Sequence, residues 1–485
     1  MMKPNILFIL SFCFLFTACS KFLDEVPEDR LAEENFYKNA EDARSAVNAV
    51  YNPLRSGVFR GPYFLQTEIM ADYAEGRGST SIIGEYHGLD VVNITRVATL
   101  WDGLYRTIRN ANIAIENIPA VPSMSDGDKN ALIAEARFLR AFSYYHLVRN
   151  WGAVPLYLST TTASSPRKPV EEVYAAIADD LQFAEASLPP KGAQYGRPGT
   201  GAAKALLAEV YLTTGKYEQA RDKAEEVITS GSFSLVNISK AEDWDNVFGA
   251  TVNGSPEEVF YLKFSHLDGW EWPHNLLYSE TSFSPFGNYV IYSTLDNKFL
   301  NAWDAQDTRK QWGVFTEYTN RKTGQVEKLP VSTPVQFSKW RDPAAPTTVG
   351  HGNDYPFLRY ADVLLIYAEA ANMAEGAPSA TALERLNMIH RRGYGYPYNA
   401  PSAVDFPATG WTQESFRDAV LQERAYELFM EGKRWLDLKR TGKVKAVIKA
   451  NKGRDVQDVH LNWPIPQQEI DTNPDITQAD QNTGY

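Results

Sequence analysis

Apolar residues recur with the period of an α-helix in several separate blocks of this chain. In the first block, Ala43, Ala46, Val47 and Val50 fall at positions i, i+3, i+4 and i+7. This spacing places them on one face of a helix, and that face has to be buried against another element. The sequence therefore predicts a mainly α fold. Comparable blocks predict further helices over residues 101–118, 128–150, 169–188, 360–375, 379–392 and 423–440.

One pair of predicted helices has the pattern of a tetratricopeptide-like hairpin. Gly215 separates two apolar stripes, one over residues 203–211 and the other over residues 217–228. The small residues Ala208 and Ala220 allow two helices to approach closely, and Tyr211 can fill the space beside them. The residues between 360 and 392 form a second such pair. We therefore expect a scaffold of helical hairpins rather than one long regular array.

The predicted helix over residues 423–440 is strongly charged. Within it, Glu431, Arg434, Asp437 and Arg440 lie three residues apart, so their side chains can pair along one face of a helix. Charge ladders of this kind are common on helices. We interpret the segment as structural rather than as an active site.

Residues 244–354 have a different composition from the helical blocks. Gly, Pro, Asn and Ser occur throughout, with short strand-like pieces at residues 259–264 and 335–340. Irregular backbone usually lies over a scaffold and carries binding residues. We expect this region to form the ligand side of the protein. The last segment, residues 462–485, contains Pro464, Pro466 and Pro474 and is expected to be extended.

The first nineteen residues have the layout of a lipoprotein signal. Lys3 precedes an apolar run over residues 6–16 that is too short to span a bilayer permanently. Thr17 and Ala18 then precede Cys19, the acceptor pattern for lipid. We predict a signal peptide over residues 1–18, lipidation of Cys19 and a spacer over residues 19–30. The alternative is an ordinary secretory signal that happens to contain a cysteine.

Composition excludes several classes of function. The formal net charge is −12 and there is no long basic run, which argues against binding to nucleic acid. Of the two cysteines, Cys13 lies in the predicted signal peptide and Cys19 would be acylated. The seven histidines show no metal-ligand spacing, and no Gly-x-Ser-x-Gly motif occurs. No pair of carboxylates stands out as glycosidase residues. We therefore predict no enzyme activity, no cofactor and no metal.

Four stretches, in this order and spread over the chain, resemble the SusD/RagB family of outer-membrane nutrient-binding lipoproteins. They are CSKFLD at residues 19–24 with Pro27 and NFY at 35–37, FLRYADVLLIYAEA at 357–370, ERAYELFMEGKRWLDLKR at 423–440, and WPIP at 463–466 followed by Glu469-Ile470, Asn473-Pro474 and Gln481-Asn482. The resemblance implies a single SusD-like domain over residues 31–485. Its helical scaffold would comprise about residues 31–240 and 355–460, its ligand-side region about 244–354, and its tail 462–485.

The resemblance also implies a function. Members of the family capture glycan at the cell surface without cutting it and deliver it to a SusC-like TonB-dependent transporter, on which they sit as a lid. We therefore expect a protein that is lipid-anchored in the outer membrane, faces the cell surface and has a glycan ligand. Three alternatives remain open: capture of peptide or protein by the same architecture, a lipid-anchored glycoside hydrolase, and a helical scaffold without a small ligand.

Two segments have the composition of a glycan site, in which aromatic rings stack on sugars and polar groups bind their hydroxyls. One covers residues 72–87 and the other residues 266–292. In the family, the stretch after the first helix contributes to the glycan site, which favours Asp72 and Arg77. The full set of predicted glycan-binding residues is Asp72, Arg77, Tyr86, His87, Trp270, Trp272, Asn288, Tyr289, Tyr292 and Trp312.

Overall fold

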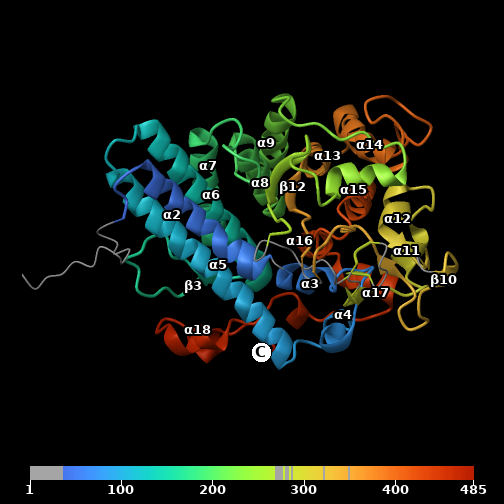
Figure 1. Ribbon diagram of the computed structural model, residues 1–485, viewed down its shortest axis with the longest axis horizontal. Helices are drawn as coiled ribbons and strands as arrows, with labels where there is room; N and C mark the ends of the chain where they lie inside the picture. The colour runs from blue at the N-terminus through green and yellow to red at the C-terminus, as the bar shows by residue number, and fades with distance from the viewer. Residues whose placement is uncertain are drawn as a thin grey trace, which may run out of the picture.

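Helices that pack against their neighbours in sequence make up most of this protein, as predicted (Figure 1). The computed structural model describes residues 36–59, 61–267, 277–278, 283–285, 288–320, 323–347 and 350–485, and of residue 288 the backbone alone. Within these residues the strands are short and pair only two at a time. The fold is therefore mainly α, with small ribbons between the helices.

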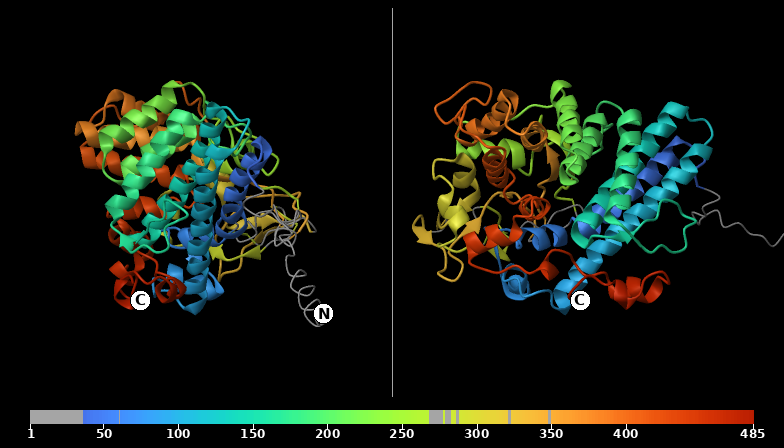
Figure 2. Two further views of the ribbon diagram at one scale, coloured as in Figure 1. Left: turned by 90° about the vertical axis from the view of Figure 1, so that its left-hand side faces the viewer. Right: turned by 180° about the vertical axis from the view of Figure 1, so that it is seen from behind.

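The long helices form one continuous array. Each contacts the next along the chain, and α9 contacts α13 across the loop-rich region. The two views of Figure 2 show α5 and α6 running side by side across the molecule. The members of the array are α2 (Ala40–Pro53), α5 (Val91–Asn117), α6 (Asp126–Trp151), α7 (Val170–Ser187), α8 (Thr200–Thr213), α9 (Tyr217–Thr229), α13 (Tyr360–Glu375), α14 (Ala380–Gly393) and α15 (Gln413–Glu427).

The predicted hairpin around Gly215 is confirmed. Helices α8 and α9 pack against each other, and Gly215 adopts a φ of 73° in the turn between them. Ala208 and Ala220 are fully buried, as close packing of two helices requires. Helix α5 is longer than predicted: it begins at Val91, where the Asp90 carboxylate accepts a hydrogen bond of 2.9 Å from the Asn93 amide.

The loop-rich region leaves and rejoins the array at one place. Strand β4 (Glu258–Leu262) pairs antiparallel with β12 (Tyr355–Arg359), so the chain between them begins and ends at neighbouring strands. The predicted strands at 259–264 and 335–340 correspond to β4 and the shorter β11. The remaining strands are β1 (Glu75–Gly76), β2 (Val154–Pro155), β3 (Arg167–Lys168), β5 (Leu277–Tyr278), β6 (Asn288–Tyr289), β7 (Ile291–Tyr292), β8 (Val314–Phe315), β9 (Glu317–Thr319), β10 (Val326–Lys328) and β11 (Gln336–Phe337).

Short helices complete the fold. The segment after residue 462, which we expected to be extended, contains a helical piece, α18. The short helices are α3 (Pro62–Glu68), α4 (Ser81–Gly84), α10 (Asp245–Phe248), α11 (Lys298–Ala302), α12 (Thr308–Gly313), α16 (Arg434–Arg440), α17 (Val444–Lys452) and α18 (Gln467–Thr472).

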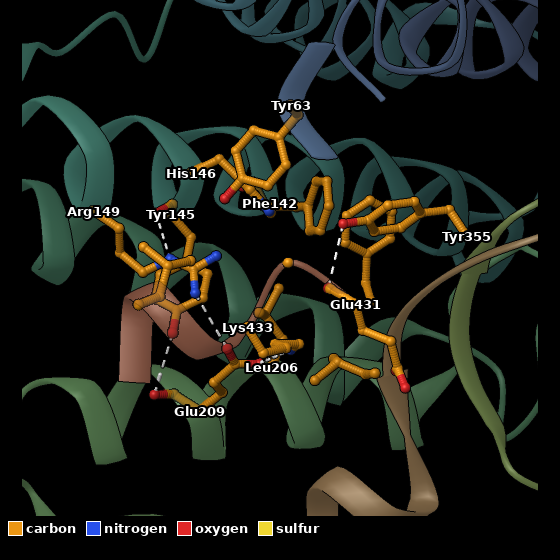
Figure 3. Close-up of a pocket in the computed structure, with 14 residues that line it drawn as sticks. Tyr63, Phe142, Tyr145, His146, Arg149, Leu206, Glu209, Tyr355, Glu431 and Lys433 are labelled. Atoms are coloured by element: carbon orange, nitrogen blue, oxygen red, sulfur yellow. Dashed lines mark hydrogen bonds and ion pairs between the residues drawn. The ribbon is translucent and has the colours of Figure 1, made fainter. Parts of the chain in front are cut away.

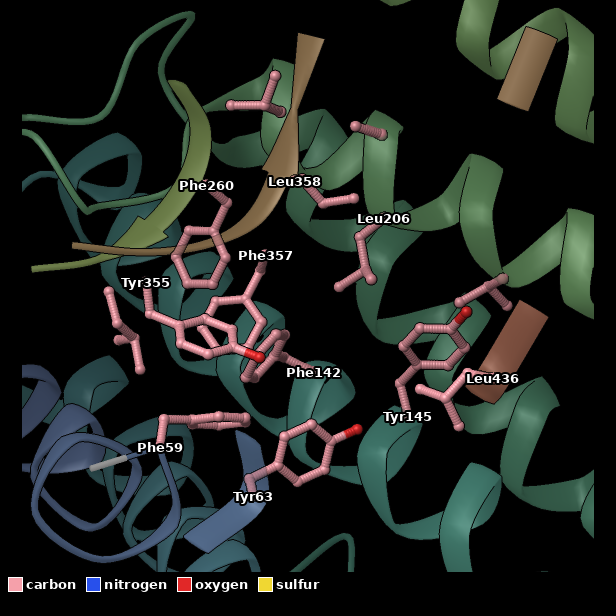
Figure 4. Close-up of a cluster of buried hydrophobic side chains, with 14 of the residues drawn as sticks. Phe59, Tyr63, Phe142, Tyr145, Leu206, Phe260, Tyr355, Phe357, Leu358 and Leu436 are labelled. Atoms are coloured by element: carbon pink, nitrogen blue, oxygen red, sulfur yellow. The ribbon is translucent and has the colours of Figure 1, made fainter. Parts of the chain in front are cut away.

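An aromatic cluster joins the N-terminal helices to the β4–β12 ribbon (Figure 4). The ring centroid of Phe357 on β12 lies 4.5 Å from that of Phe59 and 4.6 Å from that of Phe142 on α6. Phe260 on β4 contacts Phe142 in the same way, at 5.5 Å. All four side chains are buried. Edge-to-face contacts of this kind fix the ribbon against the helices as well as removing apolar area from water.

The charged segment 423–440 is not one helix, so that prediction was wrong. Helix α15 ends at Glu427 and α16 begins at Arg434. Between them Met430 and Gly432 adopt φ values of 58° and 74°, a conformation that stops a right-handed helix. A Cβ on Gly432 would also lie 2.6 Å from the Tyr355 hydroxyl, so only glycine fits. The turn points Glu431 into the interior.

Glu431 and Glu427 meet Arg359 in a buried ion network. The Arg359 guanidinium lies 2.8 Å from Glu431, 2.9 Å from Glu427 and 3.0 Å from Glu257, and the exposure of all four side chains is 1% or less. Arg392 on α14 also binds Glu257 and Glu427. Burial alone would raise the pKa of Glu427, but its arginine partners lower it to about 2. The network therefore consists of charged, mutually neutralising groups.

Replacing Arg359 tests the contribution of this network to stability. We expect Arg359→Met to lower the free energy of unfolding by about 3–5 kcal/mol, since it leaves buried carboxylates without a partner. Arg221→Met is the matched control, because Arg221 forms ion pairs with Asp222 and Glu375 at the surface, where such pairs contribute at most about 1 kcal/mol. Denaturant unfolding of both variants measures the difference, and equal losses would contradict the structural role of Arg359.

Glu68 at the end of α3 should make stability depend on pH. Its carboxylate accepts hydrogen bonds from the Tyr73 hydroxyl (2.6 Å) and the Gly432 amide, yet burial raises its pKa from 4.5 to about 7. A raised carboxyl pKa favours folding fully below pH 4.5, and this contribution is lost as the pH rises through about 7.

Glu68→Gln removes that titration. Between about pH 5 and pH 8, the wild-type protein should lose up to about 3 kcal/mol of stability relative to the variant. The surface substitution Glu41→Gln should show no such trend, because Glu41 is exposed in the first turn of α2. Unfolding free energies at several pH values decide the matter: parallel curves for wild type and Glu68→Gln would count against an abnormal Glu68.

Candidate functional site

The structure brings together two segments that the sequence singled out separately. Strand β1 pairs antiparallel with β7, with Glu75 opposite Tyr292 and Gly76 opposite Ile291. The Arg77 amide continues the ladder by donating a hydrogen bond of 2.8 Å to the Val290 carbonyl. Residues from the predicted segments 72–87 and 266–292 therefore share one surface.

Arg77 and Tyr289 form the centre of this surface. The Arg77 guanidinium lies over the Tyr289 ring, with its central carbon 4.5 Å from the ring centroid. Arg77 is exposed and Tyr289 is half-buried. The Tyr289 hydroxyl forms a hydrogen bond of 2.9 Å with the Thr333 hydroxyl, which fixes the ring. The surface thus offers an oriented aromatic ring beside a group with several hydrogen-bond donors.

Tyr292 on β7 is paired with Glu75, whose carboxylate takes part in ion pairs. Arg454 donates to the Glu75 carboxylate at 2.6 Å, and the buried Lys452 ammonium lies 3.6 Å from it. Lys452 also donates to the Ala74 carbonyl at 2.6 Å, which ties the segment to α17. Burial first, and then the charge of Glu75, raise the pKa of Tyr292, so its hydroxyl stays protonated and can donate.

Polar contacts fix the loop that follows β1. Arg96 on α5 donates to the Ser79 hydroxyl at 3.0 Å and to the Asn93 side chain at 2.7 Å. Asn93 in turn donates to the Ser79 carbonyl at 2.7 Å. Val91, at the start of the same helix, is 79% exposed. The loop therefore presents polar groups next to an uncovered apolar side chain.

His87 is exposed on the turn that ends this segment. Its ring nitrogen Nδ1 lies 3.3 Å from the Glu85 carboxylate, and both side chains face solvent. The segment thus keeps two of its predicted ligand residues, Arg77 and His87, on the surface.

Three other predicted residues are interior, which corrects the expectation that they are exposed. Asp72 is fully buried and binds Arg434 through two hydrogen bonds of 2.8 and 2.9 Å. Burial would raise the pKa of Asp72, but Arg434 keeps it below its ordinary value. Tyr86 donates to the Met70 carbonyl at 2.8 Å, and Trp312 donates to Asp245 at 3.2 Å. Each of these side chains has a structural partner.

Four predicted residues cannot be placed in the same way. Cys19, Trp270 and Trp272 lie outside the described residues. Asn288 is described by its backbone alone, which pairs with Tyr278 between β6 and β5. Their predicted roles in lipidation and glycan binding stay predictions.

Sequence reasoning missed several residues that contribute to this surface. Arg96, Arg454 and Thr333 come from distant parts of the chain and bear no motif of their own. Asp90, which caps α5 three residues before Asn93, is the one local signal that could have drawn attention to the start of α5.

The clearest cavities lie away from the surface at Arg77 and Tyr289. A pocket lined by Tyr63, His146 and Arg149 has a volume of about 20 Å³, which is room for one water molecule at most (Figure 3). A groove of about 570 Å³ runs between Tyr105 and Tyr157 near α5 and α18. A pocket of about 340 Å³ lies beside α16.

The described residues can also be compared with the requirements of a metal site and of a membrane-spanning helix. Among the described residues, no cluster of three or more His, Cys, Asp or Glu side chains has the arrangement of a metal site. None of the described helices combines the length and the apolar composition needed to cross a bilayer.

Known proteins resemble this chain over nearly its whole length. Residues 251–485 match the profile of the SusD family, and residues 19–212 match a profile described as starch-binding and associating with the outer membrane. The SusD-like protein P2 of Formosa agariphila is 29% identical, and the match covers 100% of both chains. The starch-binding protein SusD of Bacteroides thetaiotaomicron is 23% identical over 75% of this chain and 74% of its own.

A solved structure agrees with these matches. A SusD homolog from Bacteroides thetaiotaomicron superposes with a TM-score of 0.80 at 26% identity, covering 94% of this chain and 99% of its own. Sequence profiles at both ends, full-length relatives and the shared mainly helical fold point to one conclusion. The chain belongs to the SusD/RagB family.

Proposed function

We propose that this protein binds glycan at the cell surface without cleaving it and passes it to a SusC-like TonB-dependent transporter. The family supports the ligand class, because one relative is a starch-binding protein and one matching profile is described as starch-binding and associating with the outer membrane. The same profile supports a location at the outer membrane. Lipidation of Cys19 and a cell-surface orientation complete the proposal.

The observation that carries this proposal is the stacking of the exposed Arg77 side chain on the half-buried Tyr289 ring, next to the β1–β7 strand pair. Sugar rings present flat C–H faces that pack on aromatic rings, and their hydroxyls bind donors placed around the ring. Tyr289 supplies the first element, while Arg77 and the Tyr292 hydroxyl supply the second. His87, Asn288, Trp270 and Trp272 stay proposed members of this site.

The charge of the surface favours a ligand without strong positive charge. The chain as a whole carries a net charge of −12, but Arg77 and Arg96 flank this site and local charge overrides the total. Guanidinium groups bind neutral hydroxyls as well as carboxylates. We therefore propose a neutral glycan and not a cationic one.

Substitution of Tyr289 tests the site. Tyr289→Ala should weaken glycan binding about tenfold or more, because an ordered aromatic contact is lost. Tyr289→Phe keeps the ring and should retain most of the affinity. Arg77→Met should also weaken binding. Calorimetric titration of each variant against starch and a panel of other neutral polysaccharides supplies the measurement.

The control is Tyr396→Ala, since Tyr396 is a tyrosine with 42% exposure in the helical scaffold. The glycan affinity of this variant should match that of the wild type. Equal binding by Tyr289→Ala and the control would remove Tyr289 from the site. Binding of peptides with indifference to sugars would support the alternative ligand class, and release of sugar products by the wild type would support a hydrolase instead.

A further inference from the structure

A pocket in the helical scaffold has the size of a small-molecule site. It lies where the end of α6, the start of α7, the end of α8 and α16 meet, and its volume is about 340 Å³. This falls at the lower end of the range of about 300–1,000 Å³ for ligand pockets. One part of its lining is apolar, formed by Val148, Val170, Tyr174 and Leu436.

The charged part of the lining has more cations than carboxylates. Its acidic side chains are Glu209 and Asp437, and both are already shared between two cations. Glu209 lies 3.3 Å from Arg149 and 3.1 Å from Lys433 (Figure 3). Asp437 lies 2.8 Å from Arg424 and 2.9 Å from Arg440. The cations that line the pocket are Arg149, Lys433, Lys439 and Arg440.

Lys439 is the cation of the lining that forms no ion pair with Glu209 or Asp437. Its ammonium donates to the Arg149 carbonyl at 2.5 Å and to the Asn462 amide oxygen at 2.8 Å. No carboxylate lies within ion-pair distance of it among the residues described in this structure. An ammonium has three N–H donors, so one is left for a further acceptor. Lys439 is half-buried. A cation that is partly removed from water and has no anionic partner is costly, and an anion in the pocket would relieve that cost.

We propose that this pocket binds a small carboxylate with an apolar body. The carboxylate accepts a hydrogen bond from Lys439, and the body packs against Val170, Tyr174 and Leu436. No residue of this pocket belongs to the surface at Arg77 and Tyr289. The inference therefore does not depend on the proposed glycan function.

Binding should also be linked to proton uptake. Burial, and then the nearby charge of Arg149, lower the pKa of Lys439 to about 7. The other charged groups facing it, on α8 and α16, are already paired with one another. A bound carboxylate stabilises the charged ammonium and raises that pKa. At pH 7 each bound carboxylate should therefore take up about half a proton.

Benzoate is the probe, with benzamide as its neutral isostere and acetate as a carboxylate without an apolar body. Titration calorimetry with the purified protein should show binding of benzoate, weaker binding of acetate and none of benzamide. Repeating the benzoate titration in Hepes and in Tris buffer, which differ in ionisation enthalpy, measures the proton uptake.

Lys439→Met keeps the length of the side chain and removes its charge, and should weaken benzoate binding at least tenfold. Val170→Trp fills the pocket while keeping Lys439, so it tests the site even if Lys439→Met folds poorly. Lys445→Met on the surface of α17 is the matched control and should bind as wild type does.

The proposal is overturned if benzoate does not bind the folded wild type, if benzamide binds equally well, or if Lys439→Met and Val170→Trp both bind like the control. Equal affinities for benzoate and acetate would contradict the proposal that the ligand carries an apolar body. None of these results bears on glycan binding, which the substitutions at Tyr289 test separately.

Discussion

The fold depends on one buried arginine. Arg359 ends β12, and its three carboxylate partners are the residue before β4, the last residue of α15 and a residue of the turn that follows α15. These elements are more than sixty residues apart in the chain, and they meet only when the helical array has closed on the ribbon. Buried charges tolerate little displacement, because losing a partner leaves an unsolvated charge. The network therefore fixes the β4–β12 ribbon against α14 and against the turn between α15 and α16.

Much of the scaffold could be predicted because amphipathic helices reveal themselves locally. Helix α13 has the predicted bounds, and the hairpin at Gly215 was recognised from its small residues and its glycine. The break between α15 and α16 was missed. The charge spacing over residues 423–440 suits a helix, but Gly432 has to fit beneath Tyr355, a contact set by the tertiary structure. The start of α5 was missed because its first turn breaks the apolar pattern: Val91 and Val92 are exposed, and Asn93 is buried in their place.

The candidate site, like the scaffold, could be predicted from the sequence only in part. Composition found the segments that carry Arg77 and Tyr289, and the strand pairing then joined them. Composition could not separate an exposed ring or carboxylate from a buried one. Asp72 and Arg77 stand five residues apart in the same polar segment, yet one forms an interior ion pair with Arg434 and the other faces solvent. Only the positions of distant partners decide between these two outcomes.

The pairing of β4 with β12 has a consequence for how such proteins diversify. The region between these strands begins and ends at the same ribbon, so the length of its loops can change without moving the two strands apart. Residues such as Arg309 and Lys339, which form buried ion pairs with Glu423 and Glu431, have to be kept. The entropic cost of a longer loop grows only slowly with its length. Insertions in its loops would then alter the surface that the region presents while the pairing of β4 with β12 is kept.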